Sequence, residues 1–281
     1  MKILVTGGGG LVGRAVVAHC RAQGDTVTAP AHNSCDITDE RAVSALVTQT
    51  QPDYVINCAA WTDVDGCERE PERAFRENAD GPEHLARACR DVGAGLLTIS
   101  TDYVFDGTKE GYYTQRDQPH AVNVYAAAKI AGERRAAETW ARTIIVRTGW
   151  IFGAGGRNFL SQVVERSRAG AHLKGISDAY GTPTYAPDLA ERLRELILLD
   201  VPGVFHVVNN GLGVSYEEFA RYVCEVAGGP ETIVQGVSSA DLQRAAQRPA
   251  NTRLACLWSE RLGLPALPEW TDGVRRWLEI A

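Results

Sequence analysis

Residues 2–13 of the chain read KILVTGGGGLVG, a short apolar strand that runs into four consecutive glycines and then into the start of a helix. Gly7, Gly10 and Gly13 recur at intervals of three. Glycines in this position permit a tight turn, let the backbone approach a pyrophosphate and allow the helix to pack closely on the strand. The free N–H groups and partial positive charge at the start of a helix also suit an anion. The stretch therefore predicts a dinucleotide-binding turn, with a glycine turn that holds no ligand as the alternative.

Apolar runs and helical stretches alternate through the first half of the chain. Strands are predicted at residues 2–6, 25–29, 54–57, 95–100 and 143–148, with a helical stretch after each of the first four. This alternation predicts an α/β fold with a Rossmann-type, doubly wound parallel sheet, in which ligands bind at the carboxyl ends of the strands. We assign residues 1–150 to this NAD(P)-binding domain.

The pattern changes after Gly153. Helices are predicted at 158–168, 188–199 and 216–227, and strands at 173–177 and 204–208, while Trp258 and Trp270 fall in a short closing segment. No low-complexity linker separates the two parts of the chain. We predict a smaller α/β substrate domain over residues 151–281, and it stays open whether some later segments return to the first domain.

The composition argues against several classes of protein. A net charge of −6 disfavours nucleic-acid binding, and no apolar run reaches the roughly 18–20 residues that span a bilayer. The apolar run before the glycines is too short for the core of a signal peptide. The seven cysteines show no CxxC spacing and the six histidines form no metal-binding pair. We expect a cytoplasmic protein with free thiols and with no membrane or nucleic-acid partner.

Tyr125 and Lys129 lie four residues apart in a predicted helix over 124–141, so they share one face. A neighbouring ammonium favours the phenolate and so lowers the pKa of a tyrosine toward the working pH. Such a phenol can give a proton to a forming alkoxide. The pair predicts a site of proton transfer, with a surface pair at helical spacing as the alternative.

A polar stretch closes the fourth predicted strand, where residues 100–105 read STDYVF. A hydroxyl there can hydrogen-bond a substrate oxygen or the tyrosine. A polar cap of the strand is the alternative, and the nearby Tyr125 and Lys129 favour the functional interpretation.

The end of the second predicted strand does not settle the form of the dinucleotide. An acid there favours NAD and an arginine favours NADP, but residues 29–33 read APAHN. Asp36 is better placed to reach the adenine, or else it begins the next helix. The choice between NADPH and NADH stays open.

Eight blocks of sequence, spread along essentially the whole chain, carry a family resemblance. They are TGGGGLVG (6–13), DITD (36–39), NCAAWTDVD (57–65), STDYVF (100–105), NVYAAAKIAGE (123–133), RTGWIFG (147–153), YGTPT (180–184) and RPANTRL (248–254). With them the chain resembles the extended short-chain dehydrogenase/reductases and, within these, the dTDP-4-dehydrorhamnose reductase family. The resemblance implies NADPH- or NADH-dependent reduction of the C4 keto group of dTDP-4-dehydro-L-rhamnose to dTDP-L-rhamnose.

The resemblance also implies a role for individual positions. Tyr125 would be the proton donor, Lys129 its partner on the cofactor ribose and Thr101 the hydroxyl that tunes the pair. The cofactor would be bound by Gly7, Gly10, Leu11, Val12, Asp36, Ile37, Ala60, Trp61, Thr62, Tyr125 and Lys129. The sugar nucleotide would be bound by Val64, Thr101, Asp102, Trp150 and Arg253, the last with a structural salt bridge as the alternative. Some relatives hold magnesium partly through a glutamate where this chain has Ala15, so we predict no metal.

Other activities of the superfamily fit the residues less well. The sugar-nucleotide 4,6-dehydratases carry an Asp-Glu pair where this chain has Asp102-Tyr103, so a dehydratase is disfavoured. A 4-epimerase ranks low because its relatives usually have a longer substrate domain. Two alternatives stay open: a 4-ketoreductase for another nucleotide-linked deoxysugar, and a regulatory subunit that binds the cofactor without turnover. We expect a monomer or a homodimer.

Overall fold

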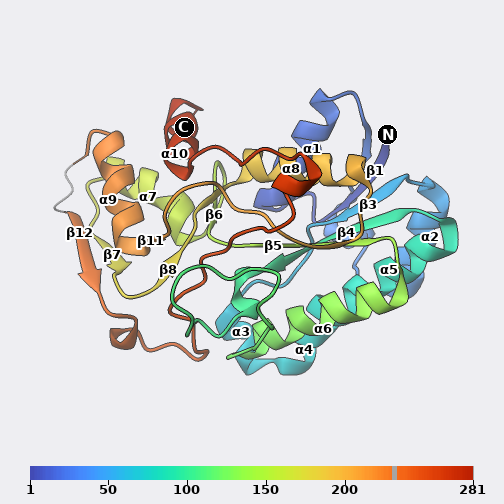
Figure 1. Cartoon of the computed structure of the whole chain (residues 1–281), viewed down its shortest axis with the longest axis horizontal. Coiled ribbons are helices and arrows are strands. Elements are labelled where there is room, and N and C mark those ends of the chain that lie inside the picture. Colours follow the sequence, from blue (N-terminus) through green and yellow to red (C-terminus); the bar gives the residue numbers. More distant parts are fainter. Residues whose placement is uncertain (230–232, 281) are drawn as a thin grey trace.

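A six-stranded parallel sheet forms the centre of the structure, a computed structural model that describes residues 1–229 and 233–280 (Figure 1). Its strands are β1 (Lys2–Thr6), β2 (Thr26–Thr28), β3 (Tyr54–Asn57), β4 (Gly95–Thr101), β5 (Thr143–Thr148) and β10 (Gly203–His206), in the order β10-β5-β4-β3-β1-β2. Every neighbouring pair is parallel. The chain adds β2 on one side of β1 and β3 on the other, so the strand order reverses beside β1, where such sheets bind ligands. The predicted fold class is confirmed.

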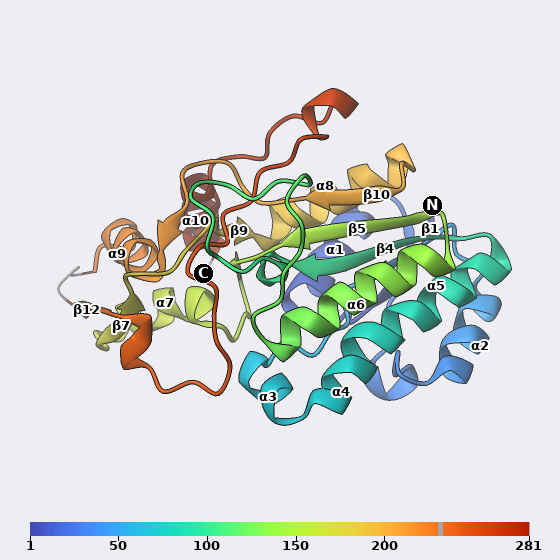
Figure 2. The ribbon, with the colours of Figure 1, turned by 60° about the horizontal axis from the view of Figure 1, so that its bottom comes forward.

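Helices cover both faces of this sheet (Figures 1 and 2). One face carries α1 (Leu11–Ala22) and α8 (Ala186–Leu199), and the other carries α2 (Glu40–Thr50), α5 (Gly81–Val92) and α6 (Val124–Thr139). Successive side chains of a strand point to opposite faces. In β1, Ile3 and Val5 therefore pack in the core under α1 and α8, while Leu4 packs in the core under α2 and α5.

Two elements of this layered unit come from beyond residue 150. Strand β10 pairs with β5, with Val204 opposite Ile145, and α8 packs against α1. The chain thus leaves the sheet after β5 and returns to it later. The division into domains at residue 150 remains a prediction.

A helical run connects β3 to β4 and packs against α6. It consists of α3 (Val64–Arg69), α4 (Pro71–Phe75), a π-helical turn (Arg76–Asp80) and α5. The side chain of Asn78 in the π turn bonds both the N–H and the C=O of Trp61, at 3.0 and 2.9 Å. This pair of bonds holds the loop that follows β3.

The remaining elements build a second core beside the sheet. They are β6 (Ile151–Phe152), α7 (Phe159–Arg168), β7 (Leu173–Ile176), β8 (Tyr180–Gly181), β9 (Thr184–Tyr185), β11 (Val214–Ser215), α9 (Tyr216–Val226), β12 (Val234–Val237) and α10 (Trp270–Ile280). Short 3-10 helices lie at other points of the chain, at His32–Ser34, Asp102–Val104, Ser239–Asp241 and Glu260–Leu262. The second core is aromatic, with Phe152, Phe219 and Trp277 buried together. The sequence predicted no helix at α10, which buries Trp270 and Trp277 against this core.

All seven cysteines are unpaired, and five of them are buried. Within residues 1–229 and 233–280, no helix combines the length and apolar character needed to cross a membrane.

Candidate active site

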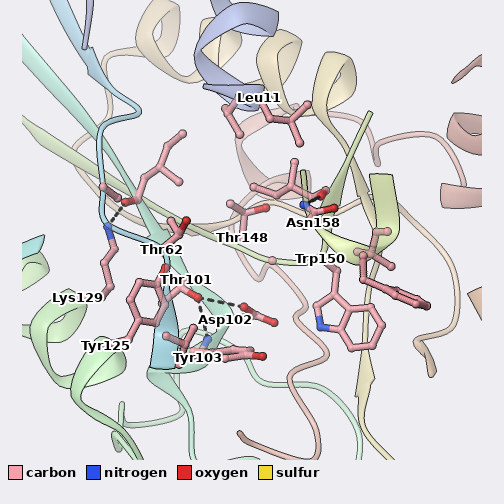
Figure 3. Close-up of a pocket in the computed structure, with 18 of the residues that line it drawn as sticks. Leu11, Thr62, Thr101, Asp102, Tyr103, Tyr125, Lys129, Thr148, Trp150 and Asn158 are labelled. Carbon is pink, nitrogen blue, oxygen red and sulfur yellow. Dashed lines mark hydrogen bonds between the residues drawn. The ribbon is translucent and has the colours of Figure 1, made fainter. Parts of the chain in front are cut away.

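A cavity of about 710 Å³ opens at the carboxyl ends of the central strands, between the sheet and the second core (Figure 3). Most of the predicted site residues line it: Gly10, Leu11, Val12, Ala60, Thr62, Val64, Thr101, Asp102, Tyr125, Lys129 and Trp150. Outside its lining lie Gly7, Asp36, Ile37, Trp61 and Arg253. Residues far apart in the sequence therefore meet in one cavity.

The glycine turn forms one end of the cavity. Gly7 has a positive φ of 67°, and its C=O accepts a hydrogen bond from the N–H of Gly10 at 2.9 Å. A Cβ atom on Gly13 would lie 2.1 Å from the Gly7 oxygen, so α1 packs closer to the turn than any other residue allows. Helix α1 begins after Gly10 without a side-chain cap and without an acidic residue in its first turn. Its first N–H groups thus face the cavity free to bind an anion, which fits the pyrophosphate of a dinucleotide.

Asp36 and Ile37 lie away from this cavity. The Asp36 carboxylate accepts the N–H of Thr38 at 2.9 Å, and this bond lowers its pKa. Ile37 is buried against Gly81, where a Cβ atom would be 2.6 Å from the Ile37 side chain. The cap of α2 is Asp39, not Asp36. A role of Asp36 and Ile37 at the adenosine remains a prediction.

The loop after β3 supplies one wall through Ala60, Thr62 and Val64. Trp61, which lies between them in the sequence, instead stacks under the guanidinium of Arg73, with 4.1 Å between the guanidinium carbon and the ring centre.

Helix α6 presents Tyr125 and Lys129 to the cavity. Asn123 caps the helix by accepting the N–H of Ala126 at 2.8 Å, which sets the register of the two side chains. The Lys129 ammonium donates a hydrogen bond to the Ile99 C=O at 2.7 Å, and burial lowers its pKa to about 8. Burial raises the pKa of Tyr125 above its usual value. The predicted lowering of this pKa is therefore wrong for this structure, because the loss of water outweighs nearby polar groups. The phenol is protonated at neutral pH, as a proton donor must be.

Thr101 and Asp102 lie beside Tyr125 at the end of β4 (Figure 3). The Thr101 hydroxyl caps a 3-10 helix by accepting the N–H of Tyr103 at 3.1 Å, and it donates to Asp102 Oδ1 at 3.1 Å. The Asp102 side chain is buried, and burial raises its pKa to about 6. A hydroxyl and a buried carboxyl group thus line the cavity together with the phenol.

An aromatic wall closes the cavity on the side of the second core. The Trp150 ring stacks on Tyr216 with ring centres 3.7 Å apart, and its N–H donates to the Thr252 hydroxyl at 3.2 Å. Trp150 has a positive φ of 51°, which is unusual for a bulky residue and is typical of functional sites. A Cβ atom on Gly181 would lie 2.0 Å from the ring, so a glycine is needed for the ring to lie here.

Three cations at the far end of the cavity were missed by the sequence analysis: Lys174, Arg244 and Arg248. Arg248 makes a two-bond ion pair with Asp65 of α3, at 2.5 and 2.9 Å. Among the described residues, Lys174 and Arg244 pair with no carboxylate. This end of the cavity therefore suits a second anionic ligand.

Arg253, the cation that the sequence analysis selected, lies elsewhere. Its guanidinium donates to Asn251 at 2.9 Å and lies over the rings of Tyr112 and Tyr180. Arg248 is the first residue of the same RPANTRL block. The block therefore correctly indicated a cation of the cavity, but the sequence did not show which of its two arginines lines it. In the part of the chain that the structure describes, no cluster of His, Cys, Asp or Glu is arranged to hold a metal.

The Rossmann sheet, its glycine turn and the Tyr125–Lys129 pair in one cavity define a dinucleotide-dependent oxidoreductase. The chain belongs to the RmlD substrate binding domain family, whose model matches residues 1–281. This confirms the family that the sequence motifs predicted.

The chain is similar to named relatives over nearly its whole length. A dTDP-4-dehydrorhamnose reductase from Mycobacterium tuberculosis is 39% identical over 280 residues, covering 97% of this chain and 91% of the relative. A dTDP-4-keto-6-deoxy-D-glucose reductase from Streptomyces niveus is 34% identical over 273 residues, covering 96% and 94%. The crystal structure of dTDP-4-dehydrorhamnose reductase from Bacillus anthracis in complex with NADP is 31% identical, with a TM-score of 0.95 and 100% of each chain covered.

Proposed function

We propose that the protein reduces the C4 keto group of dTDP-4-dehydro-L-rhamnose to give dTDP-L-rhamnose, with NADPH or NADH as cofactor and Tyr125 as proton donor. The observation that carries this proposal is the buried, protonated phenol of Tyr125 in the same cavity as the glycine turn and the cations Lys174, Arg244 and Arg248. The relatives named dTDP-4-dehydrorhamnose reductase support the choice of substrate.

The chain's own residues suit the binding of the cofactor. The N–H groups at Leu11 and Val12, next to Gly10, would hold the pyrophosphate, and the Lys129 ammonium would hold the ribose next to the nicotinamide. With a pKa of about 8, Lys129 is mostly charged at neutral pH. When bound, the reduced nicotinamide would supply the hydride.

The sugar would lie against Tyr125, Thr101, Val64 and Trp150, because these side chains line the cavity. The diphosphate would lie at Lys174, Arg244 and Arg248, whose charges match it. Tyr125 would then give its hydroxyl proton to the oxygen at C4 as negative charge develops there. The Thr101 hydroxyl would stabilise the phenolate that remains.

A second candidate is a 4-ketoreductase for another nucleotide-linked deoxysugar, supported by the Streptomyces niveus relative. A regulatory subunit is less well supported, because Thr101, Tyr125 and Lys129 all line the cavity. The two reductase candidates share every contact named above and differ only in the sugar.

The test is a spectrophotometric assay at 340 nm with NADPH or NADH and dTDP-4-dehydro-L-rhamnose made in situ. We expect oxidation of the cofactor, and a loss of about 10²-fold or more in Tyr125→Phe with its cofactor affinity unchanged. Product analysis by NMR would identify the sugar. Near-normal turnover in Tyr125→Phe would remove this residue from the mechanism. No turnover in an enzyme that binds cofactor would favour another keto sugar and then a regulatory subunit.

A further inference from the structure

The side chain of Asn123 joins two parts of the site that are remote in sequence. Its Oδ1 atom accepts the N–H of Ala126 at 2.8 Å and so caps α6, the helix that carries Tyr125. Its Nδ2 atom donates to the C=O of Gln247 at 2.8 Å, and Gln247 directly precedes Arg248. Asn123 is only 7% exposed, and hydrogen bonds are stronger where water is excluded. One buried amide therefore holds both the start of α6 and a segment that supplies a cation to the cavity.

The segment 246–248 is also held by α3. The Asp65 carboxylate accepts the N–H of Ala246 at 2.9 Å and forms the ion pair with Arg248. On the same helix, the Glu68 carboxylate accepts the N–H of the first residue of α6 at 3.0 Å. Helix α3, the start of α6 and the segment 246–248 thus form one hydrogen-bonded cluster. The cluster joins three stretches of chain that meet only in the folded structure.

The cap of α6 does not by itself require an asparagine. Serine and aspartate cap helices about as well, because the cap needs only a side-chain oxygen. In this chain α2 is capped by Asp39 and α9 by Ser215. An asparagine adds an N–H donor on the same short side chain, and here that donor bonds Gln247. The amide therefore does two things at once, and only the second needs its nitrogen.

We propose that Asn123 is a positioning residue that fixes Tyr125 relative to Arg248, an inference that rests on the proposed function. Tyr125 and Arg248 line the cavity, whereas Asn123 lies outside its lining and acts through α6. The phenol would meet the C4 oxygen and the guanidinium the diphosphate of one sugar nucleotide. The substrate sets the spacing of these two groups, so both contacts form together only if the protein holds a matching spacing. A misplacement of about 1 Å can lower a rate about 10²-fold.

Asn123→Ser tests the link, because it keeps an oxygen for the cap but has no donor for Gln247. In the assay at 340 nm we expect kcat to fall about tenfold. The Kd for NADPH in calorimetry should stay within about threefold, since the glycine turn is untouched and Lys129 keeps its bond to the Ile99 C=O. The solvent deuterium isotope effect on kcat should rise, because proton transfer from Tyr125 becomes the slower step. A purely structural role would lower the temperature of unfolding and leave this isotope effect unchanged.

A second variant and a control separate the missing donor from the cap. Asn123→Asp keeps the size of the side chain and the cap but places an oxygen where the donor was, so kcat should fall at least as far as in Asn123→Ser. Asp39→Ser is the matched control for a serine cap, because Asp39 caps α2 and lies outside the lining of the cavity. Its kcat should stay within about twofold of the wild-type value.

Four outcomes would overturn the positioning role. Wild-type kcat in either variant of Asn123 would show that the bond to Gln247 does not matter for turnover. An equal loss of kcat in Asp39→Ser would attribute the effect to helix caps in general. An unchanged isotope effect at a lowered kcat would place the loss in a step other than proton transfer. A raised KM for the sugar nucleotide at wild-type kcat would limit Asn123 to substrate binding.

These outcomes leave the proposed function standing, because Tyr125→Phe tests that function separately in the same assay. If Tyr125→Phe turns over at a near-normal rate, the proposed function fails and the positioning role of Asn123 fails with it. If Tyr125→Phe is inactive and both variants of Asn123 have wild-type kcat, only the positioning role fails.

Discussion

We predict that a single methyl group added at Gly13 weakens cofactor binding, because Gly13 packs closely against Gly7. In Gly13→Ala the new Cβ atom would lie 2.1 Å from the Gly7 oxygen and 2.7 Å from Gly8 Cα, whereas Cβ atoms in proteins stay beyond 3.0 Å of other atoms. The start of α1 must therefore move by about 0.9 Å from the turn. Both partners are backbone, so no flexible side chain can absorb the overlap.

The size of the effect follows from this displacement. Overpacking of this kind destabilises a protein by about 1–3 kcal/mol, whereas the higher helix propensity of alanine stabilises it by about 1 kcal/mol. The free energy of unfolding should therefore fall by up to about 2 kcal/mol. Cofactor binding should suffer more, because the N–H groups of Leu11 and Val12 move with α1. Weakening two hydrogen bonds to a charged group by about 1.5 kcal/mol each corresponds to roughly 10²-fold in affinity.

Gly9→Ala is the matched control in the same turn. A Cβ atom on Gly9 meets no atom within 4 Å, and Gly9 is outside the lining of the cavity. Its affinity should stay within about threefold of wild type. We would measure NADPH binding by calorimetry and stability by thermal unfolding. Wild-type affinity in Gly13→Ala, or an equal loss in Gly9→Ala, would refute the view that close packing of α1 on the turn creates the pyrophosphate site.

Three further perturbations test other parts of the structure. Burial lowers the pKa of His206 to about 4 from 6.5, so the folded protein holds it neutral. Its contribution of about 3 kcal/mol is present above pH 6.5 and is lost as the pH falls toward 4, so denaturant titrations should show a smaller loss over this range in His206→Asn. If His206→Asn loses as much stability over this pH range as the wild type, groups other than His206 cause the acid sensitivity. Asp65→Asn weakens the anchor of Arg248, so the KM for the sugar nucleotide should rise about tenfold with kcat within about twofold in steady-state assays. A fall in kcat at constant KM would contradict a binding role. Gly149→Ala pushes a methyl group into the Asp102 carboxyl group and should cost about 1–3 kcal/mol by chemical denaturation. Wild-type stability would argue against the buried position of that group.

Much of the fold follows from local patterns. The five strands predicted for the first half form within a few residues of the expected bounds, because short apolar runs between helical stretches are themselves the signal for a buried parallel strand. The sixth strand, β10, was predicted as a strand, but nothing in its own residues says which sheet it joins. Helix α10 was missed, since its apolar side chains become a core face only against Phe152 and Tyr185.

The residues of the candidate site also fall into two groups, those that the sequence could predict and those that it could not. Residues that belong to one short motif, such as Gly10 to Val12 or Tyr125 with Lys129, could be found because the chemistry depends on their spacing. Asp65 and Arg248 could not, since 183 residues separate them and only the packing of α3 against the later loop brings them together. The direction of the pKa shift of Tyr125 depends on how much water reaches the phenol, which no local pattern records.

The sequence by itself determined the kind of protein: a parallel α/β sheet, a glycine turn for a dinucleotide and a tyrosine–lysine pair on one helix, all of which depend on neighbours within a few positions. Tertiary structure alone decided which arginine reaches the cavity, which of the two predicted tryptophans forms its wall and how deeply Tyr125 and Asp102 are buried. These properties are set by distances and burial between segments of the chain that are remote in sequence. They arise because the second core packs beside the carboxyl ends of the strands and buries side chains such as Tyr125 and Asp102 between them.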